Sequence, residues 1–383
     1  MNTFVAGLVG ALAMLLSVQV SATSLRPAVA EEPIEAVVAA LSDHQIIAVG
    51  EVHQLEAHGR FWLRLIREPR VIDLVNDVVV EAGSSTHQAT MDRFVAGEPV
   101  PYEQLRRVWE DANPVGVFDV PMYEELFWAV RARNLTFPTK RPLRVILAGP
   151  GIDWSKVKSR ADFEVQVRQS IQPEAREDYW VARRIAEEVV RKGRKALVLQ
   201  GQMHAFKTQP SAGPVGQSWE MSILRTQYGA KVFSLVPVST TVLSRIDARA
   251  NSWPTPFLIH LAGTAFGSVP LSSLLSTGAS DASAMERFNV GLRAPAETQL
   301  DAIVVLESAS EMTFAQPTHA LCMDKRYIDR RLQRLRSTDG SSKSADAWLA
   351  GFTARCDRTL VCHALYELPE LSGAARIDGR CGR

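Results

Sequence analysis

Acid and imidazole side chains stand at the ends of several short apolar runs in this sequence. Glu51 and His53 follow the first run, and Glu81 follows the second. His204 follows the fourth run, just beyond a glycine. A histidine held by a carboxylate can act as a general base toward water. We therefore predict that these four side chains form one catalytic site for the hydrolysis of an ester, a lactone or an amide.

The same four residues allow a second chemistry. Two histidines and two glutamates can hold a divalent metal ion and leave one position open for water. Glu51, His53, Glu81 and His204 are therefore also the predicted metal ligands if the reaction depends on a metal. The residues alone leave metal-free and metal-assisted hydrolysis both open.

Two further residues are candidates for substrate binding. Asp153 follows the third apolar run through Gly149-Pro150-Gly151, and His58 lies shortly after the first run. Each also has an ordinary structural interpretation, because aspartate often caps a turn after glycine and His58 would be a solvated residue. Glu51 also has an ordinary structural interpretation, since a carboxylate at the start of a helix interacts favourably with the helix dipole.

The apolar runs predict the strands that must position these residues. They are continuous rather than alternating, which is typical of parallel strands buried on both faces, and helical stretches between them indicate βαβ units. The fold class expected is therefore α/β, a mostly parallel sheet flanked by helices. Ligands of such sheets bind beyond the carboxyl ends of the strands. Strands are expected at residues 46–49, 78–80, 143–148, 196–200, 231–238 and 302–306.

Several familiar catalytic signatures are absent from the sequence. No G-x-S-x-G elbow is present, which disfavours an ordinary serine α/β-hydrolase. No H-E-x-x-H zinc-protease helix and no P-loop occur. The net charge of +1 over 383 residues, without a basic block, gives no reason to expect a nucleic-acid partner. The expected partner is a small-molecule or peptide substrate.

The first 30 residues resemble an export signal. Residues 5–20 are nearly all apolar, and both Val20-Ser21-Ala22 and Ala28-Val29-Ala30 look like small-residue cleavage sites. Met1-Asn2-Thr3 carries no Lys or Arg, so an uncleaved anchor is the alternative. The run is shorter than the roughly 20 residues that span a bilayer. We expect a periplasmic or secreted protein with no stable membrane span after cleavage.

Composition divides the rest of the chain in two. Residues 31–310 are expected to form the α/β domain, with an irregular insertion at about 251–295 that is rich in Ser, Gly, Ala and Pro. Residues 311–383 form a C-terminal extension that carries all the cysteines. An even number of cysteines in an exported chain predicts two disulfides with three pairings open, and four reduced thiols are the alternative. These cysteines are Cys322, Cys356, Cys362 and Cys381.

The ordered motifs resemble a known superfamily. Residues 46–53, 79–81 and 201–204 are similar to the erythromycin-esterase-like/ChaN-like group, with the TraB/TIKI proteins as distant relatives. The resemblance covers about residues 33–238, with 301–307 as a last strand. It implies an α/β fold with a mostly parallel sheet. It also implies that His53, Glu81 and His204 are catalytic and that Glu51 supports them.

Members of this group are described as macrolactone-opening esterases, haem-binding proteins and metal-dependent proteases. Our first expectation is an exported hydrolase, with a divalent metal ion as its candidate cofactor. The alternative is a ChaN-like protein that binds haem or iron without catalysis. Haem needs an axial His, Tyr or Met in an apolar cleft, and His58, His87, Tyr123 and Met203 are the candidates. A member of the fold that only scaffolds a partner is the third hypothesis.

Overall fold

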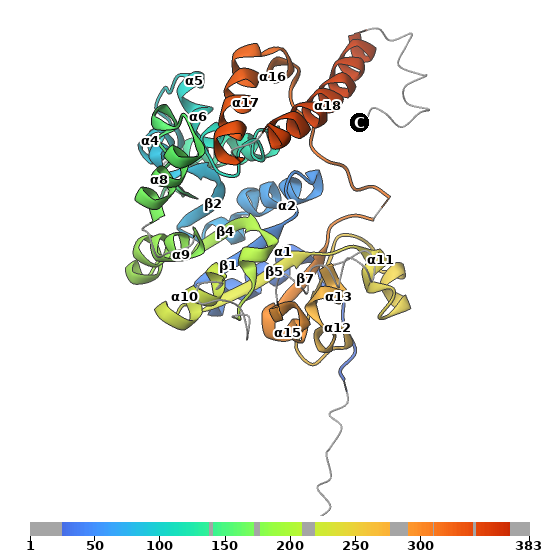
Figure 1. Cartoon of the computed structure of the whole chain (residues 1–383). Helices are drawn as coiled ribbons and strands as arrows, with labels where there is room; N and C mark the ends of the chain where they lie inside the picture. The colour runs from blue at the N-terminus through green and yellow to red at the C-terminus, as the bar shows by residue number, and fades with distance from the viewer. Residues whose placement is uncertain are drawn as a thin grey trace, which may run out of the picture.

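The core of the molecule is a seven-stranded sheet with the order β3-β2-β4-β1-β5-β7-β6 (Figure 1). The computed structural model describes residues 25–137, 141–171, 177–208, 219–275, 290–308, 310–339 and 342–367. All neighbouring strands are parallel except β6 and β7. The predicted fold class, a mostly parallel sheet flanked by helices, is confirmed. The strands are β1 (Ile46–Glu51), β2 (Asp77–Ser84), β3 (Arg144–Gly149), β4 (Ala196–Gly201), β5 (Val232–Pro237), β6 (Phe257–His260) and β7 (Ala302–Val305).

The strands form where the sequence places continuous apolar and β-branched runs. Every residue of β1, β4 and β5 is buried, because helices cover both faces of the sheet. Strand β6 lies inside the stretch 251–295, where composition predicts irregular structure. It pairs antiparallel with β7, and on its other side Leu258 exchanges two backbone hydrogen bonds with Glu31. That stretch therefore contributes a strand to the sheet, while its residues 276–289 lie outside the described ones.

One face of the sheet is covered by helices from the first third of the chain. Helix α2 contributes Phe61, Trp62, Leu65 and Ile66, each at most 2% exposed. Complete burial of such a side chain stabilises the fold by about 1.5–3 kcal/mol. The helices on this face are α1 (Pro33–Asp43), α2 (Glu56–Arg67), α3 (Pro69–Ile72), α4 (Gln88–Val95), α5 (Tyr102–Leu105), α6 (Arg107–Glu110) and α7 (Pro121–Thr136).

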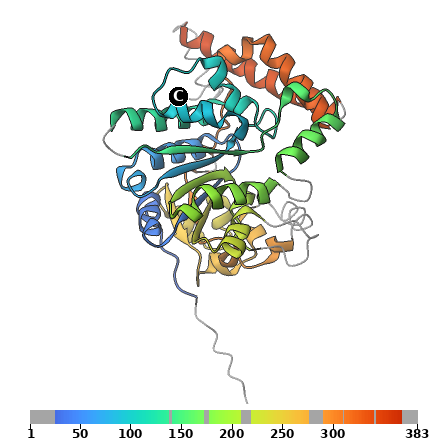
Figure 2. The same cartoon turned by 90° about the vertical axis from the view of Figure 1, so that its left-hand side faces the viewer.

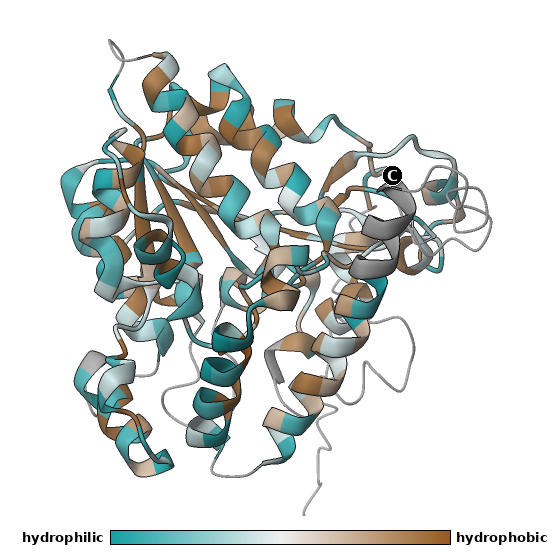
Figure 3. Ribbon diagram, turned by 90° about the horizontal axis from the view of Figure 1, so that it is seen from above, coloured by the Kyte–Doolittle hydropathy of each residue, from teal (hydrophilic) through white to brown (hydrophobic). Residues whose placement is uncertain are grey.

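The opposite face is covered by helices from later in the chain (Figure 2). Apolar residues gather on the strands between the two layers, as the hydropathy colouring shows (Figure 3). The helices of this second layer are α9 (Glu177–Glu188), α10 (Glu220–Tyr228), α11 (Thr240–Leu243), α12 (Ala265–Ser268), α13 (Leu271–Leu275) and α15 (Ala296–Gln299). Short 3-10 helices lie in the connections between these elements: η1 (Ser85–His87), η2 (Trp154–Lys156), η3 (Val190–Lys192), η4 (Gln202–Ala205), η5 (Ala248–Ser252) and η6 (Val290–Arg293).

The direction in which successive strands are added to the sheet reverses between β1 and β4. These strands are neighbours, but α2, which follows β1, packs on one face, while α10, the first α-helix after β4, packs on the other. The two connections therefore leave the carboxyl edge on opposite faces of the sheet. Ligands of open α/β sheets bind at such a switch point. We therefore expect the functional site at the loops that follow β1 and β4.

The C-terminal extension forms a helical layer beside α5, α6 and α8 (Arg160–Ile171) (Figure 1). It consists of α16 (His319–Met323), α17 (Lys325–Asp339) and α18 (Lys343–Glu367). A disulfide joins Cys322 to Cys356 and so links α16 to α18. Two disulfides were predicted with their pairing left open, and this bridge is the one found among the described residues. The side chain of Cys362 and the whole of Cys381 lie outside the described residues, as do residues 1–24 with most of the predicted signal.

No described helix combines the length and the apolar character needed to cross a membrane.

Candidate functional site

Glu51 and His53 form a hydrogen-bonded pair at the end of β1. Glu51 is the last residue of the strand and is 2% exposed. Its Oε1 lies 2.7 Å from His53 Nδ1 and accepts a hydrogen bond of 2.8 Å from the Tyr123 hydroxyl. Its Oε2 is buried without a hydrogen-bond partner in the described part of the chain. Glu51 is therefore a fixed acceptor that orients the imidazole.

The charges of this pair follow from burial and from each other. Burial raises the pKa of Glu51. Burial alone would lower the pKa of His53, but the hydrogen bond to Glu51 and the charges of Glu51 and Glu81 outweigh it and raise that pKa. Because Nδ1 is engaged by Glu51, the Nε2 atom is the one left to meet a ligand.

Glu81 reaches the same place from β2. Its Oε2 accepts a 2.7 Å hydrogen bond from the backbone N–H of Gly201, the last residue of β4. A Cβ at Gly201 would lie 3.1 Å from His53 Cε1 and 3.3 Å from Glu81 Oε2. Gly201 is thus in contact with both side chains, and the absence of a side chain there lets them approach each other.

His204, in η4, completes the predicted set. Its Nε2 lies 3.7 Å from Glu81 Oε1, and its Nδ1 lies 2.7 Å from Asp178 Oδ1. Burial would lower its pKa, but the charges of Glu81 and Asp178 and the hydrogen bond to Asp178 raise it to about 10. His204 is therefore a cation at neutral pH. The structure brings Glu51, His53, Glu81 and His204 together, as the strand ends predict.

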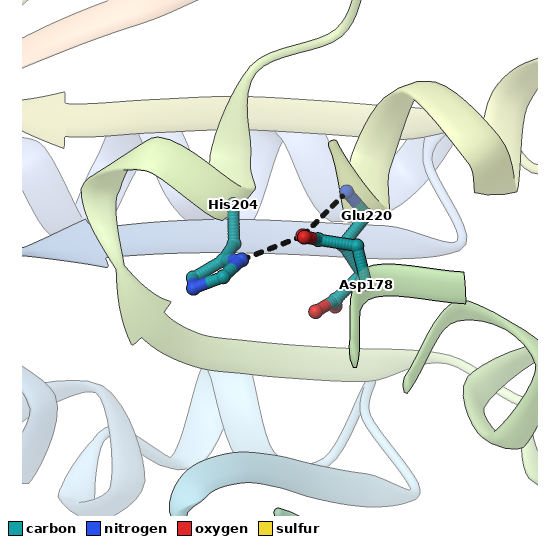
Figure 4. Close-up of side chains that lie close together, drawn as sticks. All are labelled: Asp178, His204 and Glu220. Atoms are coloured by element: carbon teal, nitrogen blue, oxygen red, sulfur yellow. Dashed lines mark hydrogen bonds and ion pairs between the residues drawn. The ribbon is translucent and has the colours of Figure 1, made fainter. Parts of the chain in front are cut away.

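Three acidic residues near His204 were not found from the sequence: Glu177, Asp178 and Glu220. Asp178 is on α9 and Glu220 opens α10, and the Asp178 carboxylate accepts hydrogen bonds from both His204 and the Glu220 backbone N–H (Figure 4). Burial and the charge of Glu81 raise the pKa of Glu177 to about 7, and burial raises that of Glu220 well above its ordinary value. The adjacent acids at positions 177 and 178 were the available signal, but acids in a first helical turn are usually explained by the helix dipole.

Asp178, His204 and Glu220 could hold a metal ion. One ligand atom from each residue lies within 4.8 Å of the others. Carboxylate and imidazole groups suit Zn²⁺ and similar divalent ions. These residues, with Glu81 and Glu177, line a cavity of about 10 Å³, which has room for about one water-sized particle. An ion fits this space, whereas an organic group does not.

His58 lies in a different part of the sheet edge. It is 5% exposed, and its Nδ1 accepts a 3.0 Å hydrogen bond from the Val52 N–H. Burial lowers its pKa to about 4, so it is neutral at pH 7. It lines a pocket of about 210 Å³ between β1, β5 and β7. The walls of this pocket are mostly apolar, with Gln202 of η4 at its margin.

Asp153 is placed apart from the other predicted residues. Its carboxylate accepts hydrogen bonds from the backbone and hydroxyl of Ser155 at the start of η2 and pairs with Lys156 at 3.0 Å. The side chain is 43% exposed. Asp153 therefore caps a turn, which was the structural alternative to substrate binding. Among the described residues, no contact joins it to the His53 or His204 groups.

Comparison with known proteins gives limited guidance. No family model and no curated protein matches the chain. Similar solved structures include a succinoglycan biosynthesis protein (10% identity, TM-score 0.48, 75% of this chain and 95% of that one). A Bacillus cereus protein (12%, 0.45, 74% and 92%) and an erythromycin esterase mutant in its open conformation (9%, 0.43, 73% and 94%) are also similar. Likenesses this weak assign neither family nor activity, so membership of the esterase-like/ChaN-like group stays a prediction.

Proposed function

We propose that this protein is a hydrolase in which His53 takes a proton from an attacking water molecule. The observation that carries the proposal is the 2.7 Å contact between His53 Nδ1 and the buried Glu51 carboxylate. It fixes the ring so that Nε2 is free to act as the base. The His53 side chain is 34% exposed, whereas that of Glu51 is 1% exposed, so His53 is the member of the pair that can meet water.

His204 has the complementary part in this scheme. Because it is cationic at neutral pH, it cannot accept the proton from water; it stabilises the negative charge that develops on the carbonyl oxygen. The water oxygen bonds to the carbonyl carbon, its proton passes to His53 Nε2, and the bond to the leaving group then breaks. His53 returns that proton to the leaving alcohol or amine. Two groups whose pKa values are set differently by their surroundings are typical of acid–base sites.

A metal-assisted hydrolysis also has support, and in it His204 would be a neutral metal ligand instead of a cation. The ligand atoms of Asp178, His204 and Glu220 are close enough to share one ion. Such an ion would supply Lewis-acid assistance to the carbonyl or to water. The haem alternative is less well supported, because His87 Nε2 contacts Asp111 and the Tyr123 hydroxyl is bonded to Glu51.

The pocket beside His58 is our candidate for the apolar group of the substrate. Its volume of about 210 Å³ suits a compact group rather than a macrocycle, since whole-ligand pockets are commonly about 300–1,000 Å³. We also propose export to the periplasm or the exterior. The disulfide between Cys322 and Cys356 supports export because such bonds persist in oxidising compartments.

The proposal is tested with a panel of p-nitrophenyl esters of increasing acyl length, simple lactones and peptides. We expect wild-type protein to hydrolyse at least one class and His204→Ala to reduce kcat by about 100-fold or more, as loss of an oxyanion stabiliser does. Treatment with a chelator separates the two versions: loss of turnover with rescue by a divalent ion identifies the metal-assisted one. No turnover of any class, or full activity of His204→Ala, would contradict the proposal.

A further inference from the structure

The residue after His53 has an unfavourable backbone conformation. Gln54 has φ of 68°, and it is the only non-glycine residue with positive φ among those the structure describes. A side chain with a Cβ rarely adopts this region, because Cβ comes too close to the backbone. Such a conformation persists only where surrounding contacts impose it. The contacts of Gln54 therefore decide the direction in which the chain leaves His53.

Four other segments of the chain bond Gln54. Its Nε2 donates to the Val117 carbonyl at 2.6 Å, and its backbone N–H donates to the Tyr123 hydroxyl at 3.2 Å. Its carbonyl accepts from the Ala315 N–H at 2.7 Å. Its Oε1 accepts a 2.6 Å hydrogen bond from Arg355 Nη1. Only the bond from Arg355 has a charged donor, and charged donors give the stronger hydrogen bonds.

Arg355 belongs to α18, and that helix is firmly attached. The next residue, Cys356, forms the disulfide to Cys322. One turn earlier, Phe352 packs in the aromatic cluster with Trp348 and Tyr327. Because these contacts fix the helix, they also fix the guanidinium that reaches Gln54.

The same extension approaches His53 by a second path. The Tyr327 hydroxyl donates to Asp119 Oδ2 at 2.5 Å, and the buried Arg331 pairs with the other oxygen of Asp119. The preceding residue, Phe118, packs edge-to-face against the His53 ring, with ring centroids 5.5 Å apart. The extension thus supports His53 through its backbone neighbour and through its ring.

We infer that Arg355 is a positioning residue: the C-terminal helices hold Gln54 in its left-handed conformation and thereby keep His53 directed at the site. The catalytic consequence rests on the proposed function, but the positioning itself does not. The order of the site in the α/β domain would then depend on a segment about 300 residues away along the chain.

The positioning is measured by hydrogen–deuterium exchange of the full chain, without any substrate. In Arg355→Met we expect peptides that cover residues 52–56 to exchange about tenfold faster, with the rest of the protein unchanged. Arg355→Lys should restore part of the protection. Arg358→Met is the matched control, because Arg358 is an exposed arginine on the same helix. Unchanged exchange in Arg355→Met, or faster exchange throughout the molecule, would overturn the inference.

A double-mutant cycle separates this contact from general weakening of the fold. Gln54→Gly tolerates positive φ and removes the acceptor for Arg355. Arg355→Met should therefore have no further effect on exchange of residues 52–56 in the Gln54→Gly background; an effect as large as in wild type would count against the inference. If an ester of the panel is hydrolysed, Arg355→Met should lower kcat about tenfold with KM unchanged. Absence of all turnover rejects the proposed function but leaves the exchange result valid.

Discussion

At the scale of single residues, the two imidazoles of the site differ in their partners, although the pKa of each is raised. His53 has one engaged nitrogen, held by Glu51, and a second nitrogen next to Gly201. His204 lies between two carboxylates, Asp178 and Glu81. The first arrangement gives a base that can cycle between two states. The second gives a cation that persists to about pH 10.

The pH dependence of turnover follows from the raised pKa of His53. The base must be neutral to accept a proton, so kcat/KM should fall as the pH drops below that pKa, with an inflection above the ordinary 6.5. Glu51→Gln removes the charge that raises the pKa, so the inflection should move to lower pH. We would measure kcat/KM from pH 5 to 9 for both proteins. An inflection that does not move in Glu51→Gln would contradict the assigned role.

Sequence reasoning found the residues that it expected at strand ends. Glu51 closes β1 and His53 follows it, so both could be placed at the carboxyl edge without a structure. Glu81 was expected directly after the second strand, but β2 runs on to Ser84 and Glu81 lies within it. Asp178 and Glu220 could not be placed, because they lie on helices and their approach to His204 depends on how the helices pack. Sequence spacing carries no information on that packing.

At the scale of elements, the end of β4 is a point of close approach. Gly201→Ala would place a methyl group 3.1 Å from His53 Cε1 and 3.2 Å from its Nε2. The ring would have to move by a few tenths of an ångström, away from the position that Glu51 sets. We predict that kcat falls about tenfold or more while thermal stability changes little. Gly351→Ala is the control, because a Cβ at Gly351 on α18 would lie in open space. Gly193→Ala is not suitable, because Gly193 has a positive φ.

The strands were predictable from sequence wherever the apolar run was long. Five of the expected runs became β1 to β5, and the sixth became β7. Strand β6 was missed because Phe257–His260 spans only four residues within Ser-, Pro- and Gly-rich sequence. Its partners, β7 and Glu31, are distant in sequence, so tertiary pairing rather than local pattern makes it a strand.

The packing of α17 on the α/β domain depends on a buried ion pair. Arg331 is 1% exposed and pairs with Asp119, which is 8% exposed. Arg331→Met would leave the Asp119 carboxylate buried without its cation, at a cost of about 3–5 kcal/mol. Chemical denaturation should show this loss, whereas Arg336→Met, at an exposed position of the same helix, should be close to wild type. Equal stability of the two variants would contradict the structure of this interface.

At the scale of the whole molecule, the chain is a doubly covered sheet with an added helical layer. The sequence predicted an extension stapled by cysteines, and the structure shows one bridge, Cys322–Cys356. Three pairings were open in the sequence because spacing alone does not decide which cysteines meet. The same limit applies to the contact between Arg355 and Gln54, which no local pattern indicates.

The disulfide should contribute to global stability. It closes a loop with a sequence separation of 34 residues, and a loop of that length is expected to contribute about 4 kcal/mol by restricting the unfolded chain. A dithiol reductant should therefore lower the thermal unfolding temperature. The double variant Cys322→Ser/Cys356→Ser should show the lower value without reductant. An unfolding temperature that is the same for this variant and for the oxidised wild type would contradict the prediction.

The central claim is that the imidazole of His53 activates water at the carboxyl edge of the sheet. The most direct measurement is kcat/KM of His53→Ala on the best substrate of the panel, beside wild type and a matched His260→Ala control. His260 pairs with Ala302 at the start of β7, at the opposite edge of the sheet. We predict a loss of at least about 100-fold for His53→Ala, as expected when a general base is removed, and none for His260→Ala. Turnover of His53→Ala equal to that of wild type, with the fold intact, would contradict the account.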